Sequence, residues 1–186
     1  MSSPETLEPP RPARTVDLRS ADGALIRVRQ LGNSDGPRVM LSHGNGFAIE
    51  GYYAFWRHFL GECEVILHDL RNHGQNPLND PPRNDYDHFV QDWEMLRAEI
   101  PRLFGPKPTA GLYHSASALT TLHHAHAYGW HWDAVVLYDP PIVPGEGDEL
   151  REQAVAFEYM MSSWAAERPD RFDDPSQLAE AFKSTR

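Results

Sequence analysis

The chain has 186 residues, and its 17 Lys and Arg against 27 Asp and Glu give a formal net charge of −10. This length allows one domain of ordinary size, and a composition with 40% hydrophobic residues argues against a disordered chain. The acidic balance argues against non-specific nucleic-acid binding, and no apolar run is long enough to span a bilayer.

The single cysteine, Cys63, excludes an internal disulfide, and nothing suggests an oxidising compartment. The amino-terminal residues have no apolar segment of the kind that a secretory signal carries. We therefore expect a cytoplasmic protein. Residues 1–14, rich in Pro, Ser and Glu, are typical of a flexible leader.

Two segments of alternating apolar and polar residues come next, 14–19 and 24–30. The pair Asp22-Gly23 lies between them, which favours an antiparallel hairpin. Four later apolar runs are continuous and bounded by helix breakers, as in strands that are buried on both faces of a parallel sheet. These runs are Val39–Leu41, Val65–Leu67, Ala110–Tyr113 and Val135–Tyr138.

Amphipathic segments alternate with these strands, and their apolar spacing predicts helices over 52–60, 86–103 and 115–128. This order favours an α/β fold with a doubly wound, mostly parallel sheet, whose core covers residues 15–142. After residue 142 the pattern changes to a helical stripe from Leu150 to Trp164 and a second candidate helix over 176–182. No further strand is indicated before Arg186, and residues 143–186 form a separate helical segment.

In open α/β sheets, functional groups collect at the carboxyl ends of the strands. The first such loop is His43-Gly44-Asn45-Gly46, whose glycines permit a turn with exposed backbone N–H groups. Such a loop can stabilise a developing oxyanion, and an ordinary strand-to-helix turn is the alternative. In the next loop, Asp69 and Arg71 could pair and brace the chain. His73 could serve chemistry there, but a structural role is favoured.

The third loop carries Ser115 between a strand and a helix. A serine on such a turn projects its hydroxyl from the sheet, close to the next backbone N–H at the helix N-terminus. The alternative is that Ser115 only caps the helix. Ser117 is a second candidate nucleophile, but Leu119, two residues later, makes it a worse fit to the motif.

Taken together, the motifs HGNG, DLRNHG and HSAS resemble the α/β-hydrolase superfamily from about Thr15 to Arg186, and the esterase-like branch most closely. The resemblance implies that Ser115 is the nucleophile. It implies that the backbone N–H groups of Asn45 and Ala116 form the oxyanion hole, with Gly46 beside Asn45. It assigns Asp69 and Arg71 to a structural turn and residues 143–186 to the start of a helical cap.

The chain departs from the family elbow, usually Gly-x-Ser-x-Gly, because Tyr113 and Ser117 occupy the glycine positions. Ser117 is small, whereas the large Tyr113 side chain must find space where the strand and the helix approach closely. A serine nucleophile also needs a histidine base oriented by an acid, in the chain order Ser, acid, His.

No histidine follows His131, so the resemblance implies that the base and the usual acid would lie beyond Arg186, on a sheet here truncated after its sixth strand. Asp139 is a weaker candidate for the acid. We expect this chain alone to be inactive or nearly so. We also expect it to self-associate through the exposed edge of its last strand.

The function implied is a serine hydrolase that cleaves carboxylic esters or related acyl bonds of small molecules, without metal or organic cofactor. His123 and His126 share a helix face, but a third ligand for a metal is not indicated. The alternatives are a C–C bond hydrolase or a cofactor-free haloperoxidase or perhydrolase on the same fold, or a non-catalytic binding module.

Overall fold

The computed structural model describes residues 8–167, 174, 176, 177, 179 and 180. Most of the expected leader and part of the candidate helix over 176–182 lie outside the described residues. The chain divides into two compact units, Met1–Pro141 and Ile142–Arg186.

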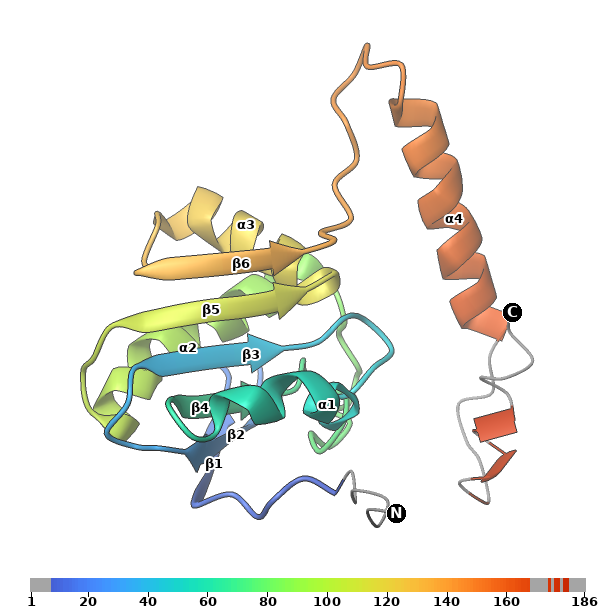
Figure 1. Ribbon diagram of the computed structural model, residues 1–186. Helices are drawn as coiled ribbons and strands as arrows, with labels where there is room; N and C mark the ends of the chain where they lie inside the picture. Colours follow the sequence, from blue (N-terminus) through green and yellow to red (C-terminus); the bar gives the residue numbers. More distant parts are fainter. Residues whose placement is uncertain (1–7, 168–173, 175, 178, 181–186) are drawn as a thin grey trace, which may run out of the picture. The chain divides into compact units, whose positions relative to one another are not determined.

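The first unit is built on a six-stranded sheet with the order β1-β2-β4-β3-β5-β6 (Figure 1). The two amino-terminal strands form the expected antiparallel hairpin, with Val16 opposite Val28, and β2 also pairs antiparallel with β4. The remaining neighbours, β4-β3-β5-β6, are parallel. The strands are β1 (Arg14–Arg19), β2 (Leu25–Gly32), β3 (Arg38–Ser42), β4 (Glu64–His68), β5 (Thr109–His114) and β6 (Ala134–Tyr138).

Helices cover both faces of the sheet, which confirms the doubly wound fold. The helix expected over 52–60 consists of three short pieces, η1 (Ile49–Tyr52), α1 (Tyr53–Trp56) and η2 (Arg57–Phe59). On the other face, α2 (Tyr86–Phe104) begins at Asp85, whose carboxylate accepts the His88 N–H at 3.0 Å. Helix α3 (Ala116–Tyr128) ends at Gly129, where φ is 87°.

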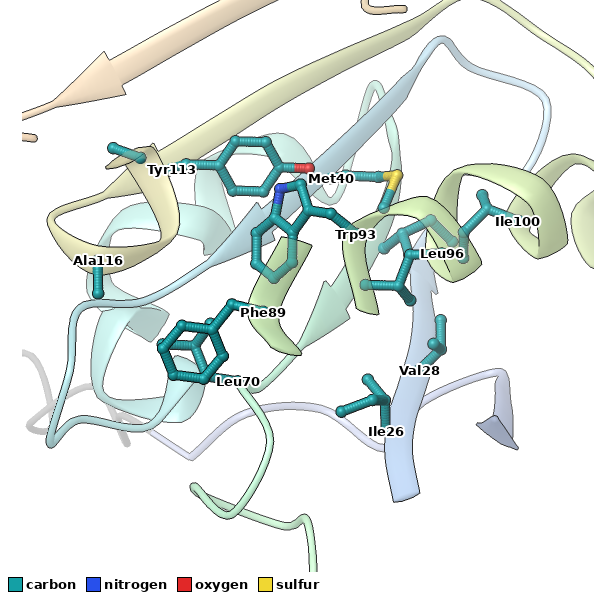
Figure 2. Close-up of a cluster of buried hydrophobic side chains, with 12 residues drawn as sticks. Ile26, Val28, Met40, Leu70, Phe89, Trp93, Leu96, Ile100, Tyr113 and Ala116 are labelled. Carbon is teal, nitrogen blue, oxygen red and sulfur yellow. The ribbon is translucent and has the colours of Figure 1, made fainter. Parts of the chain in front are cut away.

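Each face of the sheet has its own buried cluster. Trp56 is fully buried on the α1 face, where its indole N–H donates to the Ile49 carbonyl at 2.9 Å. The larger cluster lies on the other face, where Trp93 of α2 and Tyr113 of β5 pack with aliphatic side chains of β2 and β3 (Figure 2). The central strands β3 and β4 are buried at every position, as their continuous apolar sequences predict.

Strand β6 differs from that expectation. Val136 and Tyr138 on one of its faces are 61% and 69% exposed, so the prediction of burial on both faces was wrong for this strand. Its side chains alternate because only one of its faces, with Val135 and Leu137, packs against the buried cluster. An apolar sequence alone cannot show whether both faces of a strand are covered.

The second unit contains α4 (Arg151–Glu167), which lies where the helical stripe was expected. Leu150, just before it, and several apolar side chains along it are exposed, among them Phe157 and Tyr159. None of the described helices combines the length and apolarity needed to cross a bilayer.

The space for Tyr113 comes from Gly111, two residues earlier on the same strand face. A Cβ on Gly111 would lie 2.5 Å from Cε2 of the Tyr113 ring. The ring cannot move aside, because it is fully buried between Trp93 and Trp132, with ring centroids 5.5 and 5.3 Å away. The departure from glycine at position 113 is therefore accommodated by a glycine at position 111.

We expect Gly111→Ala to lower the free energy of unfolding by about 1–3 kcal/mol, because the new methyl group overpacks the Tyr113 ring. Chemical denaturation measures the change. Gly51→Ala is the matched control, since a Cβ there meets nothing within 4 Å. Equal stability of the two variants would contradict this account of the elbow strand.

His68, the last residue of β4, is a fully buried titratable group of the core. Burial lowers the pKa of its imidazole to about 3, from an ordinary value of 6.5. The unfolded chain therefore binds a proton below pH 6.5 that the folded chain does not. The resulting destabilisation is absent above that pH and grows as the pH falls towards 3.

We expect His68→Leu to reduce the dependence of unfolding free energy on pH between 6.5 and 4, by up to about 1.4 kcal/mol per pH unit. Neither ring nitrogen of His68 has a hydrogen-bond partner among the described residues, so the substitution removes no such bond. Denaturant titrations across this pH range provide the measurement, and His58→Leu at an exposed histidine is the control. An unchanged slope in His68→Leu would show that His68 does not bind its proton differently on folding.

Candidate active site

Ser115 lies on a sharp turn between β5 and α3. Its φ and ψ are 51° and −117°, in a region that non-glycine residues rarely adopt, and the residue is not part of the regular helix. Holding such a conformation costs about 1–3 kcal/mol, and strain of this size clusters at functional sites. The side chain is partly exposed and makes no capping hydrogen bond to α3. A simple helix-cap role therefore does not account for Ser115.

The Ser117 side chain stabilises this turn through hydrogen bonds to the backbone of His114. Its buried Oγ accepts the His114 N–H at 3.0 Å and donates to the His114 carbonyl at 2.9 Å. Both hydrogen-bonding functions of the hydroxyl are thus used inside the elbow, which argues against Ser117 as the nucleophile. The serine at the second glycine position of the motif stabilises the turn.

The loop after β3 touches the elbow at Gly44. A Cβ on Gly44 would lie 3.0 Å from the Ser115 Cβ and 3.0 Å from the His114 Nδ1, tighter than nine in ten observed Cβ contacts. Only glycine allows this approach without displacement. The loop that carries Asn45 is therefore held directly against the turn that carries Ser115.

Three successive amides of this loop differ in their partners. The Gly44 N–H donates to the Tyr52 hydroxyl at 3.3 Å, and the Gly46 N–H donates to His73 Nε2 at 3.1 Å. The Asn45 N–H between them has no hydrogen-bond partner within the described part of the chain. At the elbow, Ala116 is the first residue of α3, so its N–H has no partner within the helix.

Tyr52 connects the same loop to the residue before Ser115. Its hydroxyl lies 2.6 Å from His114 Nδ1. Burial raises the pKa of the Tyr52 phenol, whereas burial lowers the pKa of the His114 imidazole against the opposing charge of Asp139. The pair is therefore a protonated phenol and a neutral imidazole at pH 7.

The turn after β4 holds the loop from the other side. The Asp69 carboxylate accepts the Ile49 N–H at 2.8 Å and an Arg29 N–H at 2.6 Å. Burial opposes ionisation of Asp69, but its hydrogen bonds and the Arg29 charge outweigh burial and lower its pKa. The imidazole of His43 is buried beside it and accepts the Leu70 N–H at 3.1 Å.

The expected pairing of Asp69 with Arg71 was wrong. Arg71 instead forms a two-fold contact with Asp92 of α2, at 2.7 Å from each oxygen, and contacts Asp22 of the hairpin turn at 2.7 Å. Both Asp69 and Arg71 are almost completely buried, so each needs more hydrogen-bond partners than the other could supply. Their structural role in the turn stays a prediction.

The remaining candidates lie around this centre. Asp139 follows β6, is exposed and has a φ of 47°. In the described residues, no histidine nitrogen is hydrogen-bonded to Ser115 Oγ. His124, near the expected His123 and His126 face, contacts Glu94 at 2.9 Å. Within the described part of the chain, no group of three or more potential ligand residues converges on a metal site.

Tyr52 and His114 were not predicted from the sequence as residues of the site. Tyr52 belongs to an apolar stripe, and nothing in its spacing distinguishes a buried ring from a ring with a bonded hydroxyl. His114 adjoins the serine, but its partner comes from a segment 62 residues away in the sequence. The Ser117 hydrogen bonds are local, so the small polar residue in a tight turn was a usable signal for them.

The family is identified by a sequence match. Residues 39–184 match the model of the Alpha/beta hydrolase family, and the chain belongs to this family. No curated protein matches the chain.

Solved structures agree with this assignment at the level of the fold. A putative lipase from Acinetobacter baumannii AYE is 16% identical, with a TM-score of 0.61 over 78% of this chain and 48% of its own. An alpha/beta hydrolase from Novosphingobium aromaticivorans DSM 12444 is 23% identical, with a TM-score of 0.60 over 75% of this chain and 48% of its own. A putative aryl esterase from Burkholderia cenocepacia is 20% identical, with a TM-score of 0.53 over 67% of this chain and 46% of its own. This chain thus spans about half the length of the structures that it matches.

We expect Ser117→Ala to lower the free energy of unfolding by about 1–3 kcal/mol, because it leaves the His114 N–H and carbonyl without their partner. Urea titration measures the loss, and Ser162→Ala at an exposed position is the control. If Ser117→Ala were as stable as the control, the Ser117 bonds would not be what holds the elbow.

Proposed function

We propose that the chain carries the nucleophile and the oxyanion hole of a serine hydrolase that acts on carboxylic esters or related acyl bonds of small molecules. The observation that carries the proposal is the strained Ser115 turn in contact with Gly44. It brings a partly exposed hydroxyl close to a loop whose Asn45 N–H has no partner among the described residues. The family match supports a hydrolase, and the lipase and aryl esterase among the similar structures favour acyl substrates.

In this mechanism, Ser115 Oγ attacks the carbonyl carbon of the substrate and loses its proton to a base. The carbonyl oxygen becomes an oxyanion that accepts hydrogen bonds from the N–H groups of Asn45 and Ala116. Collapse of this intermediate expels the alcohol and leaves an acyl-serine, which water hydrolyses in a second step. Gly46, the third candidate, contributes less in this proposal, because its N–H is already bonded to His73.

The nature of the nucleophile favours acyl transfer over epoxide opening, although a putative epoxide hydrolase from Pseudomonas aeruginosa is among the similar folds. A serine that opens an epoxide becomes an ether, which water does not cleave under mild conditions. A serine that attacks an ester becomes an ester, which the same site can hydrolyse. Acyl chemistry therefore regenerates the enzyme.

The proposed mechanism also needs a base and an acid. Asp139 stays a candidate acid at the end of β6, and the described residues place no histidine in hydrogen-bond contact with Ser115 Oγ. We therefore propose that this chain alone turns over esters very slowly. In serine hydrolases, loss of the base lowers kcat by about 10⁶-fold.

The open edge of β6 supports a further part of the proposal, self-association. Its backbone groups and its exposed Val136 and Tyr138 offer a surface on which a second strand can pair. The cytoplasmic location stays a prediction from the sequence.

The direct test of the nucleophile is covalent labelling with a fluorophosphonate, followed by peptide mass spectrometry. We expect slow incorporation at Ser115, complete loss of labelling in Ser115→Ala, and retained labelling in Ser162→Ala. Label at Ser117, or at no serine after long incubation, would contradict the assignment. Fast labelling, at the rate of a complete hydrolase, would contradict the proposed low activity.

Two substrates separate ester cleavage from C–C cleavage. An esterase releases p-nitrophenol from a p-nitrophenyl ester, whereas a C–C bond hydrolase cleaves a diketone. A non-catalytic binding module would cleave neither substrate.

A further inference from the structure

We propose that Tyr52 is a positioning residue whose hydroxyl holds the Asn45 amide in register with Ser115. The hydroxyl contacts both halves of the site, since it accepts the Gly44 N–H at 3.3 Å and lies 2.6 Å from His114 Nδ1. Gly44 directly precedes Asn45, and His114 directly precedes Ser115. The inference rests on the proposed function, in which Asn45 and Ser115 act on the same substrate.

The proposal assigns a direction to both hydrogen bonds. The Tyr52 oxygen accepts the Gly44 N–H and keeps its own proton for a second partner, and in this proposal it donates that proton to His114 Nδ1. A neutral imidazole that accepts at Nδ1 carries its proton on Nε2. His114 in this tautomer has no lone pair at Nε2, and Nδ1 is already occupied by Tyr52. We call the hydrogen-bonded set Gly44, Tyr52 and His114 the Tyr52 clamp. His114 belongs to this clamp and is not available as the base.

The surroundings of Tyr52 strengthen these bonds. Tyr52 and His114 line a cavity of about 380 Å³ whose other walls include Phe55, Leu112 and Tyr138. These walls are mostly apolar, and they offer the Tyr52 hydroxyl few polar partners other than Gly44 and His114. The Phe47 ring packs edge-on against Tyr52, with centroids 6.3 Å apart, and further restricts the phenol.

The clamp acts on one end of the loop. Gly46 at the other end is held by His73, whose Nε2 also lies 3.1 Å from the Asn45 side-chain oxygen, and the Gly44 carbonyl lies 2.7 Å from His43 Nδ1. Removing the Tyr52 hydroxyl should therefore free the Gly44 N–H and let the peptide planes at Gly44 and Asn45 rotate, while the bond from Gly46 to His73 and the Ser117 bonds of the elbow persist. A general loss of stability would not produce this pattern.

The experiment compares Tyr52→Phe with Tyr53→Phe in the ¹⁵N-labelled chain. Tyr53→Phe makes the same change one residue along, where the ring packs on Trp56 at a centroid distance of 4.7 Å. In Tyr52→Phe we expect the ¹⁵N resonance of His114 Nδ1 to shift downfield, towards the position of an imidazole nitrogen that accepts no hydrogen bond. We also expect the Gly44 amide to exchange about tenfold faster, as for one lost hydrogen bond of ordinary strength. If the His114 ring ¹⁵N shift and the Gly44 amide exchange rate were both as in the wild type, the proposal of a clamp would be overturned.

The second readout uses the fluorophosphonate adduct, driven to completion with excess reagent. Ser115 Oγ displaces fluoride from phosphorus, its proton passes to solvent, and the phosphonyl oxygen takes the place of the oxyanion. In the wild-type chain and in Tyr53→Phe, we expect the Asn45 and Ala116 amide protons to move downfield. In Tyr52→Phe, the Ala116 shift should persist and the Asn45 shift should fall by at least half.

The outcomes separate the two proposals. If neither amide proton changes its chemical shift in the wild-type adduct, the proposed oxyanion hole is wrong. The His114 ring ¹⁵N shift and the Gly44 amide exchange rate then decide alone whether the clamp exists. If both amide protons shift equally in the wild type, Tyr52→Phe and Tyr53→Phe, the oxyanion hole is supported and the positioning role of Tyr52 is overturned. If Asn45 responds only when the Tyr52 hydroxyl is present, both proposals are supported.

Discussion

The close approach of the Gly44 backbone to the Ser115 turn is the contact on which the rest of the site depends. A Cβ at position 44 would lie 3.0 Å from both His114 Nδ1 and the Ser115 Cβ, so a side chain there would displace these neighbours by a few tenths of an ångström. Parallel pairing of β3 with β5 brings these two loops to the same edge of the sheet, and the absence of a Cβ lets them touch. The site thus arises from strand register and the absence of a side chain at position 44, and the Tyr52 hydroxyl adds a second connection between the two loops.

Strain at Ser115 has to be maintained by its surroundings, and the structure provides several separate restraints. Ser117 closes the turn from inside the helix, and the Ser115 N–H donates to the Tyr138 carbonyl of β6 at 2.8 Å. Beneath the neighbouring loop, the buried Asp69 joins the Ile49 amide to Arg29 of β2. Buried ion pairs add little net stability, but they define a single arrangement because any other would leave a charge unpaired. The polar core therefore fixes the loops, and the two apolar clusters supply the stability.

The fold was largely predictable from the sequence, because its signals are local. All six strands and the helices α2 and α3 were expected within a few residues of their observed bounds, since apolar period and glycine or proline boundaries report them directly. The exposure of one face of β6 was not predicted, because it depends on which elements pack against the strand. The position of Ser115 on a strand-to-helix turn followed from the order of elements, whereas the partners of Asp69, Arg71 and Tyr52 did not. Apart from Gly44, which lies 8 residues from Tyr52, the partners described above are 20 or more residues away, and only tertiary packing selects among them.

In the proposed site, an oxygen on the atom bonded to Ser115 Oγ would lie between the amides of Asn45 and Ala116. A crystal structure of the chain with a phosphonate attached to Ser115 would show where this oxygen lies. We expect a phosphonyl oxygen about 2.7–3.1 Å from both amide nitrogens. A phosphonate that points into solvent, with the Asn45 amide turned away from it, would show that the proposed geometry is wrong.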